Sequence, residues 1–326
     1  MNAARFLCAR LALGLALAMP LVAPAQSQAY PAKSVRIVVP FAPGGAVDAV
    51  SRIVGGRMSE QMGIPFVIEN KPGASANLGA DLVAKAAPDG ATVLMGANGL
   101  ATNMTLFRNL PFDTLRDFAP IARVGYAPLV LVVPPSLGVN SLRELIALGK
   151  AQPGKLNYGS SGNGGSGHLA SELFTRAAGL DVLHLPYKGG APAIADLIGG
   201  RLTFMIINPL EAAPHVPTQR LRALAVAADK RIAPLPDTPT FTEAGLSGFE
   251  ASVWWGLAAP AKTPRELTAR LTAEALRALA DEGVRDKLEK LGAVVAPQDG
   301  EQFRTFLARE IDKWSGVIRA ANIRAD

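Results

Sequence analysis

The chain has 326 residues, with 33 Lys and Arg against 27 Asp and Glu. This length accommodates two modest domains or one large domain. The mild excess of positive charge suits an anionic small-molecule ligand. The basic residues form no runs and are not interleaved with aromatics, so we expect no nucleic-acid partner. Beyond the N-terminus, no apolar segment is long enough to predict a membrane-spanning helix.

The N-terminus has the pattern of a cleavable secretion signal. Two arginines precede the apolar run 11–18, and small residues follow at the candidate cleavage points Ala25 and Ala29. A membrane anchor is the alternative, but it would need roughly 20 apolar residues, and two prolines interrupt this segment. We therefore predict residues 1–29 as a signal peptide. Cys8 lies inside it, so the mature chain would have no disulfide, thiolate nucleophile or cysteine-bound metal.

The mature chain alternates short β-branched runs with amphipathic helices, which is typical of parallel α/β architecture. In the first half of the chain, the expected strands are 35–39, 66–69, 92–95 and 128–133, and the expected helices are 48–61, 78–87 and 141–152. In the second half, the expected strands are 156–158, 182–185, 203–207, 221–227 and 253–258. The expected helices there are 168–178, 191–198 and the stretch from 263 onward.

Two apolar strands, near Leu131 and Leu257, flank the middle block of the chain. We interpret them as paired crossings between a split outer domain and an inserted inner domain, which makes a two-strand hinge. The expected outer domain is 30–130 with 253–326, and the expected inner domain is 131–252.

The segment 40–48 joins the first strand to the first helix. The adjacent Gly44 and Gly45 allow backbone N–H groups to turn toward an anion, and the following helix adds its positive end. Asp48 could cap that helix or hold a water that bridges to a ligand. A tight turn with a routine helix cap is the alternative interpretation.

A second strand-to-helix loop, 159–168, offers many free amides and three serine hydroxyls. This composition suits a carboxylate or phosphate at a helix N-terminus. Gly162, Gly164 and Gly167 also match the dinucleotide pattern G-x-G-x-x-G. The acidic residue expected at the end of the next strand is missing, so we expect no dinucleotide cofactor.

Signatures of enzymes are otherwise missing: no nucleophile elbow, Walker loop or zinc-protease helix occurs. A hydrolase using Ser160 or Ser161 with His168 stays open as an alternative, although no ordered third member follows. We expect His168 to start a helix and His184 to be a satisfied core histidine. Lys188 is as compatible with an anion across a cleft as with a solvated loop.

Many short motifs then match one family in a fixed order. They include VVPFAPGGAVD at 38–48 and HLPYKG at 184–189, with others at 30–33, 69–74, 87–90, 110–113, 117–120, 153–156, 221–226, 235–240 and 243–245. On these motifs the mature chain resembles the periplasmic receptors of tripartite tricarboxylate transporters, often called Bug-type proteins. The resemblance covers the whole mature chain.

The resemblance implies an α/β, two-domain periplasmic binding protein of the Venus flytrap type with two crossover strands at the hinge, and no cofactor, metal or catalysis. The ligand would be a small carboxylate, such as a di- or tricarboxylate, an acidic amino acid or an aromatic acid. The expected partners are membrane subunits of a tripartite transporter, or a sensor ectodomain if the receptor serves sensing without transport. We expect a monomer.

In this family the ligand carboxylate sits between the two loops described above. The residues expected to contact ligand are Pro43, Gly44, Gly45, Asp48, Asn98, Ser160, Ser161, Gly162, Asn163, Gly164, His168, Lys188, Ile207 and Asn208.

Ile207 bears on the type of ligand, because many relatives carry an acidic residue there. The strand 203–207 ends beside Asn208, where ligands of open α/β sheets bind. A buried ammonium needs a charged partner, and neither residue supplies one. We therefore predict a ligand without an amine. The alternative is that Ile207 points into the core of the inner domain and is silent about the ligand.

Overall fold

Two mixed β-sheets organise the part of the chain described by the computed structural model, which is residues 34–320, 323 and 324. The predicted signal peptide, with Cys8, lies outside these residues. The six-stranded sheet has the order β11 (Val294–Gln298), β4 (Phe118–Pro128), β10 (Ser252–Pro260), β3 (Thr92–Gly96), β1 (Val35–Val39), β2 (Phe66–Asn70). The five-stranded sheet has the order β7 (Val182–Pro186), β6 (Leu156–Ser160), β8 (Phe204–Ile207), β5 (Val130–Val133), β9 (Arg222–Val226).

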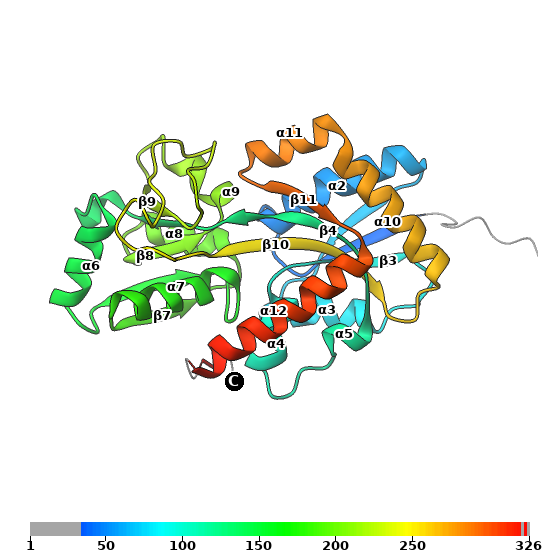
Figure 1. Cartoon of the computed structure of the whole chain (residues 1–326), viewed down its shortest axis with the longest axis horizontal. Helices are drawn as coiled ribbons and strands as arrows, with labels where there is room; N and C mark the ends of the chain where they lie inside the picture. Colours follow the sequence, from blue (N-terminus) through cyan, green and yellow to red (C-terminus); the bar gives the residue numbers. More distant parts are fainter. Residues whose placement is uncertain (1–33, 321–322, 325–326) are drawn as a thin grey trace, which may run out of the picture. The chain divides into compact units, whose positions relative to one another are not determined.

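Helices cover both sheets (Figure 1). We call each sheet with its helices a lobe. The six-stranded lobe contains α2 (Ala46–Met62), α3 (Asn77–Ala84), α4 (Gly99–Leu106), α5 (Thr114–Asp117), α10 (Arg265–Ala280), α11 (Glu282–Lys290) and α12 (Gly300–Ala320). The five-stranded lobe contains α6 (Leu142–Ala151), α7 (Ser166–Ala178), α8 (Gly190–Ile198) and α9 (Pro209–Ala212). Short 3-10 turns occur at Ala74–Ala76, Pro135–Leu137 and Ala213–His215.

The strands that cross between the lobes explain why the sheets are mixed rather than purely parallel. β1 pairs in parallel with β2 and β3, but β10 is antiparallel to both β3 and β4. β4 leads out of the six-stranded lobe and β10 leads back, so the two run side by side in opposite directions (Figure 1). The sequence pattern predicted the parallel units and the pair of crossing strands, but not the antiparallel pairing of β10 within the six-stranded sheet.

The predicted strand 128–133 divides at Leu129. β4 ends at Pro128 in one sheet, and β5 begins at Val130 in the other. The six-stranded sheet therefore draws on the two ends of the chain and the five-stranded sheet on its middle. This arrangement accords with the expected split domain, whose bounds remain a prediction.

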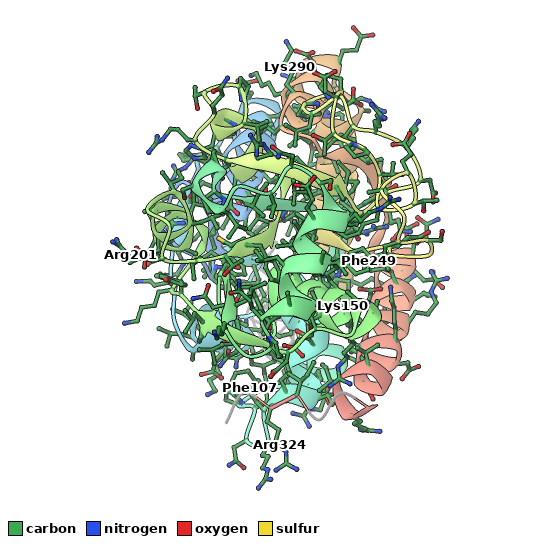
Figure 2. The ribbon with its side chains drawn as sticks, turned by 90° about the vertical axis from the view of Figure 1, so that its left-hand side faces the viewer. Phe107, Lys150, Arg201, Phe249, Lys290 and Arg324 are labelled. Carbon is green, nitrogen blue, oxygen red and sulfur yellow. The ribbon has the colours of Figure 1, made fainter. Side chains whose placement is uncertain are left out.

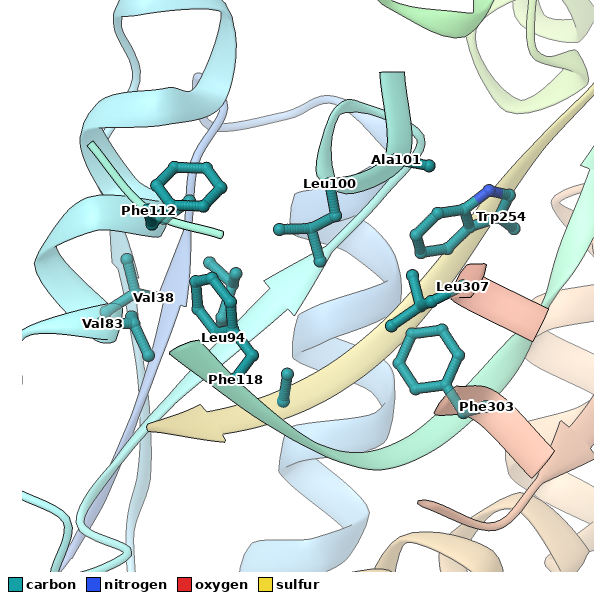
Figure 3. Close-up of a cluster of buried hydrophobic side chains, with 12 residues drawn as sticks. Val38, Val83, Leu94, Leu100, Ala101, Phe112, Phe118, Trp254, Phe303 and Leu307 are labelled. Atoms are coloured by element: carbon teal, nitrogen blue, oxygen red, sulfur yellow. The ribbon is translucent and has the colours of Figure 1, made fainter. Parts of the chain in front are cut away.

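The core of the six-stranded lobe packs against the crossing strand β10 (Figure 3). Phe303 and Leu307 of α12 lie over β10 beside Trp254, and all three side chains are buried. The Trp254 and Phe303 rings meet edge to face at 5.7 Å. Gly256 makes this approach possible, because a Cβ there would lie 2.3 Å from the Phe303 ring. Packing of α12 thus holds one strand of the crossing in place.

A wide groove lies along the crossing strands, with a volume of about 850 Å³. Its walls come from both lobes: Arg123 and Phe306 from one, and the segment 227–234 from the other. The Arg123 guanidinium lies over the Phe306 ring at 4.1 Å. Ser252 of β10 lines this groove, whereas the next residue, Val253, lines a separate cavity. Successive side chains of a strand point to opposite faces, so the crossing strands separate two cavities.

Charged side chains lie mainly at the periphery of the described residues. Arg201 and Lys290 extend outward at its edges (Figure 2), where their side chains are 70% and 74% exposed. Within the described part of the chain, every helix is too short or too polar to cross a membrane.

Candidate functional site

A small cavity of about 80 Å³ lies between the two lobes. The loops that follow β1, β3, β6, β7 and β8 all contribute to it. The loop ends of parallel strands meet at one edge of a sheet, which is where ligands of open α/β sheets bind. The lining residues are Phe41, Ala42, Pro43, Gly45, Ala46, Val47, Ala97, Asn98, Gly99, Ser161, Gly165, Ser166, Gly189, Gly190, Ala191, Asn208, Glu211 and Val253.

Four helices, α2, α4, α7 and α8, begin at this cavity, and none of them is capped by the side chain of its own N-cap residue. The first amides of a helix have no partner within it, and they form a ready site for anions. The cavity lining contains no Lys or Arg. An anion held here would therefore be bound by backbone amides and hydroxyls rather than by a cation.

The first loop is braced from behind by Asp48, which is 4% exposed. Its carboxylate accepts the Gly44 amide at 3.0 Å, two hydrogen bonds from Arg52, and the Asn70 amide at 3.0 Å. Burial alone would raise the pKa of Asp48, but these hydrogen bonds lower it below its ordinary value. Asp48 is the third residue of α2 and does not line the cavity. Asp48 therefore braces the turn rather than acting as the N-cap residue of α2, which is Gly45. The expectation that it holds a bridging water stays a prediction.

The two glycines of this loop have different roles. Gly44 has φ of +84° and needs glycine for its backbone. Gly45 has an extended backbone, with φ of −83° and ψ of 175°, so its backbone angles admit any residue. A Cβ on Gly45 would meet the Glu211 carboxylate of the other lobe at 3.4 Å. A valine at Gly45 would therefore obstruct the cavity rather than strain the turn.

The second loop is supported by a stack of aromatic rings. The His168 and His184 rings stack at 3.9 Å, and Tyr158 stacks on His184 at 4.8 Å. The Gly164 amide donates to Nδ1 of His168 at 3.0 Å, so that nitrogen carries no proton. Burial lowers the pKa of His168 to about 4, and burial with the neighbouring His168 lowers the pKa of His184 to about 3. Both rings are neutral near pH 7.

The serine and histidine pairing differs from the one expected for a hydrolase. Ser160 Oγ lies 2.7 Å from Nε2 of His184, not beside His168. Ser160 is 1% exposed and does not line the cavity. A histidine with a pKa of about 3 is a weak base at neutral pH. This geometry gives the hydrolase alternative no support and makes the pair a support for the loop.

The second loop also contacts α4 of the other lobe. The Thr102 hydroxyl donates to the Gly164 carbonyl at 2.8 Å. A Cβ on Gly164 would collide with the Leu106 side chain. Asn98, just before α4, donates to the Ser252 carbonyl and accepts the Trp254 amide, each at 3.1 Å. The cavity loops are thereby tied to the crossing strand β10.

Glu211 is the functional candidate that sequence reasoning missed. Among the residues that line the cavity it is the only one with a charged side chain. Its carboxylate accepts the Asn208 side-chain amide at 2.9 Å and the backbone amide of Ala46 from the opposite lobe. Burial raises the pKa of Glu211 to about 7, although both hydrogen bonds act to lower it. The available signal, Asn208 followed by a proline and then Glu211, has the spacing of a routine helix cap.

Some of the expected ligand-binding residues line the cavity, and the others lie outside its lining. Those that line the cavity are Pro43, Gly45, Asn98, Ser161 and Asn208. Those placed outside its lining are Gly44, Asp48, Ser160, Gly162, Asn163, Gly164, His168, Lys188 and Ile207. Most of the second group shape the two loops, and Lys188 is exposed.

Ile207 requires a correction. It is 6% exposed and packs in the core of the five-stranded lobe with Val130 and Met205. The expectation that it faces the ligand is wrong, because its side chain points to the core face of β8. The argument for a ligand without an amine loses its basis, since Glu211 places a carboxylate in the cavity.

Within the described residues, no group of three or more His, Cys, Asp or Glu side chains is placed to hold a metal ion.

Comparison with known proteins identifies the family to which the chain is similar. Residues 50–323 match the model of the tripartite tricarboxylate transporter family receptor. The BugT protein of Bordetella pertussis is 36% identical over 92% of each chain. The solved structure of R. palustris Rpa4515 with adipate is 36% identical, with a TM-score of 0.87 over 90% of this chain and 99% of that one.

A second solved structure, MatC from Rhodopseudomonas palustris with bound malate, is 33% identical and covers 89% of this chain and all of its own, with a TM-score of 0.83. Members of the matching family are solute-binding receptors with the two-domain fold of periplasmic binding proteins. This chain belongs to the tripartite tricarboxylate transporter receptor family.

Proposed function

We propose that this protein captures a small carboxylate, such as a di- or tricarboxylate or an aromatic acid, in the cavity between its lobes. The observation that carries the proposal is the convergence of four helix N-termini, none capped by its own N-cap side chain, on a cavity lined by no Lys or Arg. The similar proteins solved with adipate and with malate support the ligand class.

The proposal includes the setting in which capture takes place. The mature receptor acts in the periplasm as a monomer and delivers its ligand to the membrane subunits of a tripartite transporter. The family match supports the role as a receptor for such a transporter. A sensory receptor that presents ligand without transport is distinguished by deleting the membrane subunits and measuring uptake of the ligand.

Binding is tested on protein that has been unfolded and refolded to remove any co-purified ligand. Calorimetry and thermal unfolding with mono-, di- and tricarboxylates should find at least one binder. A ligand at about 100 times its Kd adds roughly 2.7 kcal/mol to the free energy of unfolding. Mass spectrometry of molecules released from the protein before refolding identifies the natural ligand. A broad panel without a single binder contradicts the proposal.

A matched pair of variants locates the site. Ser161→Asp places a fixed negative charge among the helix N-termini and should abolish carboxylate binding. Ser136→Asp makes the same change at an exposed residue away from the cavity and should leave binding intact. Equal binding by both variants would show that the carboxylate binds elsewhere.

A further inference from the structure

The carboxylate of Glu211 occupies part of the cavity proposed for the ligand. Glu211 belongs to α9 of the five-stranded lobe, and it accepts the backbone amide of Ala46, the first residue of α2 in the other lobe. Gly45 and Gly190 leave the space for it. A Cβ on Gly190 would lie 2.5 Å from Oε1 of Glu211, and one on Gly45 would lie 3.4 Å away. A side chain from one lobe thus uses an anion-binding amide of the other.

The charged groups around this carboxylate come from several elements. Asp48 and Arg52 of α2 neutralise one another through two hydrogen bonds. Lys188, before α8, is exposed. His215 and Arg220 line an adjoining groove, and burial together with Arg220 lowers the pKa of His215. Within the described part of the chain, none of these groups forms an ion pair with Glu211, whose pKa burial raises to about 7.

We propose that Glu211 determines the specificity of the cavity by holding, as an internal carboxylate, the Ala46 amide that a ligand carboxylate would otherwise use. This inference rests on the proposed function. An ionised Glu211 excludes a second carboxylate at this end of the cavity, because two like charges close together in a buried site oppose one another. It accepts a hydroxyl, an ammonium or an amide N–H there instead.

A dicarboxylate can still enter when Glu211 takes up a proton from the solvent. The neutral acid then gives up the Ala46 amide and donates its own proton to the ligand. Binding of a dicarboxylate is therefore linked to uptake of one proton, whereas binding of a monocarboxylate with a donor at the other end is not. The proposal separates these two ligand classes by their dependence on pH.

The test is calorimetry of succinate, adipate and malate at pH 6 and pH 8, in pairs of buffers with different ionisation enthalpies. With a pKa of about 7, the protonated fraction of Glu211 falls about tenfold between these pH values. We expect dicarboxylate affinity to fall about tenfold, with up to one proton taken up at pH 8. Glu211→Gln should bind the same ligands equally at both pH values, and at least tenfold more tightly than wild type at pH 8.

Two control variants isolate the carboxylate. Glu144→Gln changes the third residue of α6, an exposed glutamate in the same helix position, and should keep the wild-type pH dependence. His215→Gln should also keep it, which assigns the titration to Glu211. Glu211→Ser provides a second neutral variant if the glutamine variant does not fold.

The outcomes distinguish this inference from the function beneath it. Wild-type binding that is intact but equal at pH 6 and pH 8 overturns the role of Glu211 and leaves the proposed function standing. If Glu211→Gln and Glu211→Ser retain the tenfold change in affinity between pH 6 and pH 8, the role of Glu211 is likewise overturned and the proposed function stands. Absence of carboxylate binding by wild type at both pH values overturns the proposed function, and this inference with it.

Discussion

Glu211→Gln should stabilise the ligand-free protein at pH 8 and have little effect near pH 5. The unfolded chain has the ordinary glutamate pKa of 4.5, whereas burial raises the pKa of the folded protein to about 7. The folded state binds more protons than the unfolded state between these values, so wild-type stability falls as the pH rises from about 4.5 to 7. Glutamine carries no charge, so this loss disappears in the variant.

The magnitude follows from the same shift. A rise from 4.5 to about 7 corresponds to roughly 3 kcal/mol at about 1.4 kcal/mol per pKa unit. The carboxyl group is enclosed by the protein, but the residue as a whole keeps some exposed surface, so we reduce this figure for screening by solvent to about 1–2 kcal/mol. A change of this size should raise Tm by roughly 2–8 °C.

The assay is thermal unfolding of refolded protein at pH 5 and pH 8, with Glu144→Gln as the control for a loss of charge on an exposed helix. Wild type should lose stability between these pH values by more than Glu211→Gln does. If both proteins change equally with pH, Glu211 is not the buried acid that the geometry indicates.

Three further predictions concern the framework of the site. Gly56→Ala in α2 should stabilise the protein by about 0.5–1 kcal/mol, because the added Cβ would meet no atom within 4 Å. Gly167→Ala should destabilise the protein and weaken ligand binding, because its Cβ would lie 2.5 Å from the Ile206 carbonyl oxygen. Urea unfolding measures the stability of both variants. The NMR signals of the His168 and His184 imidazole protons should not titrate between pH 5.5 and 8, since the pKa values are about 4 and 3. A titration midpoint near pH 6.5 for either ring would contradict the stacked arrangement. Phe303→Ala should lower the free energy of unfolding by about 3–5 kcal/mol, because this ring is fully buried against β10. A loss below about 1 kcal/mol in urea unfolding would show that the ring lies outside the core.

Local patterns predicted the two cavity loops correctly as connections between a strand and a helix. Glycine clusters and the change from β-branched runs to helical spacing are visible over a few residues. The antiparallel pairing of β4 with β10 joins residues more than a hundred positions apart, and no local pattern encodes it. The helix α4 was also missed, because its short segment has little amphipathic contrast.

The fine structure of the site depends on which face of each element is buried. Ile207 and Glu211 illustrate this limit, since the sequence directed attention to the first while the second reaches the cavity. A strand that is buried on both faces has no alternation to reveal its orientation. Likewise Ser160 meets His184 rather than His168, because the parallel register of β6 with β7 brings those two strands together.

The crossing strands have a cavity on each side, and this has a consequence for how affinity is determined. Val253 lines the proposed ligand cavity while Ser252 lines the large groove, and both spaces have walls from both lobes. If the lobes close on a ligand by rotating about these strands, a rotation that narrows one space widens the other. The free energy of closing would then depend on two surfaces, and only one of them is the proposed ligand site. Substitutions in the groove would then change the free energy of closing, and with it the affinity for ligand. The selectivity of the cavity would stay the same, because its own lining is unchanged.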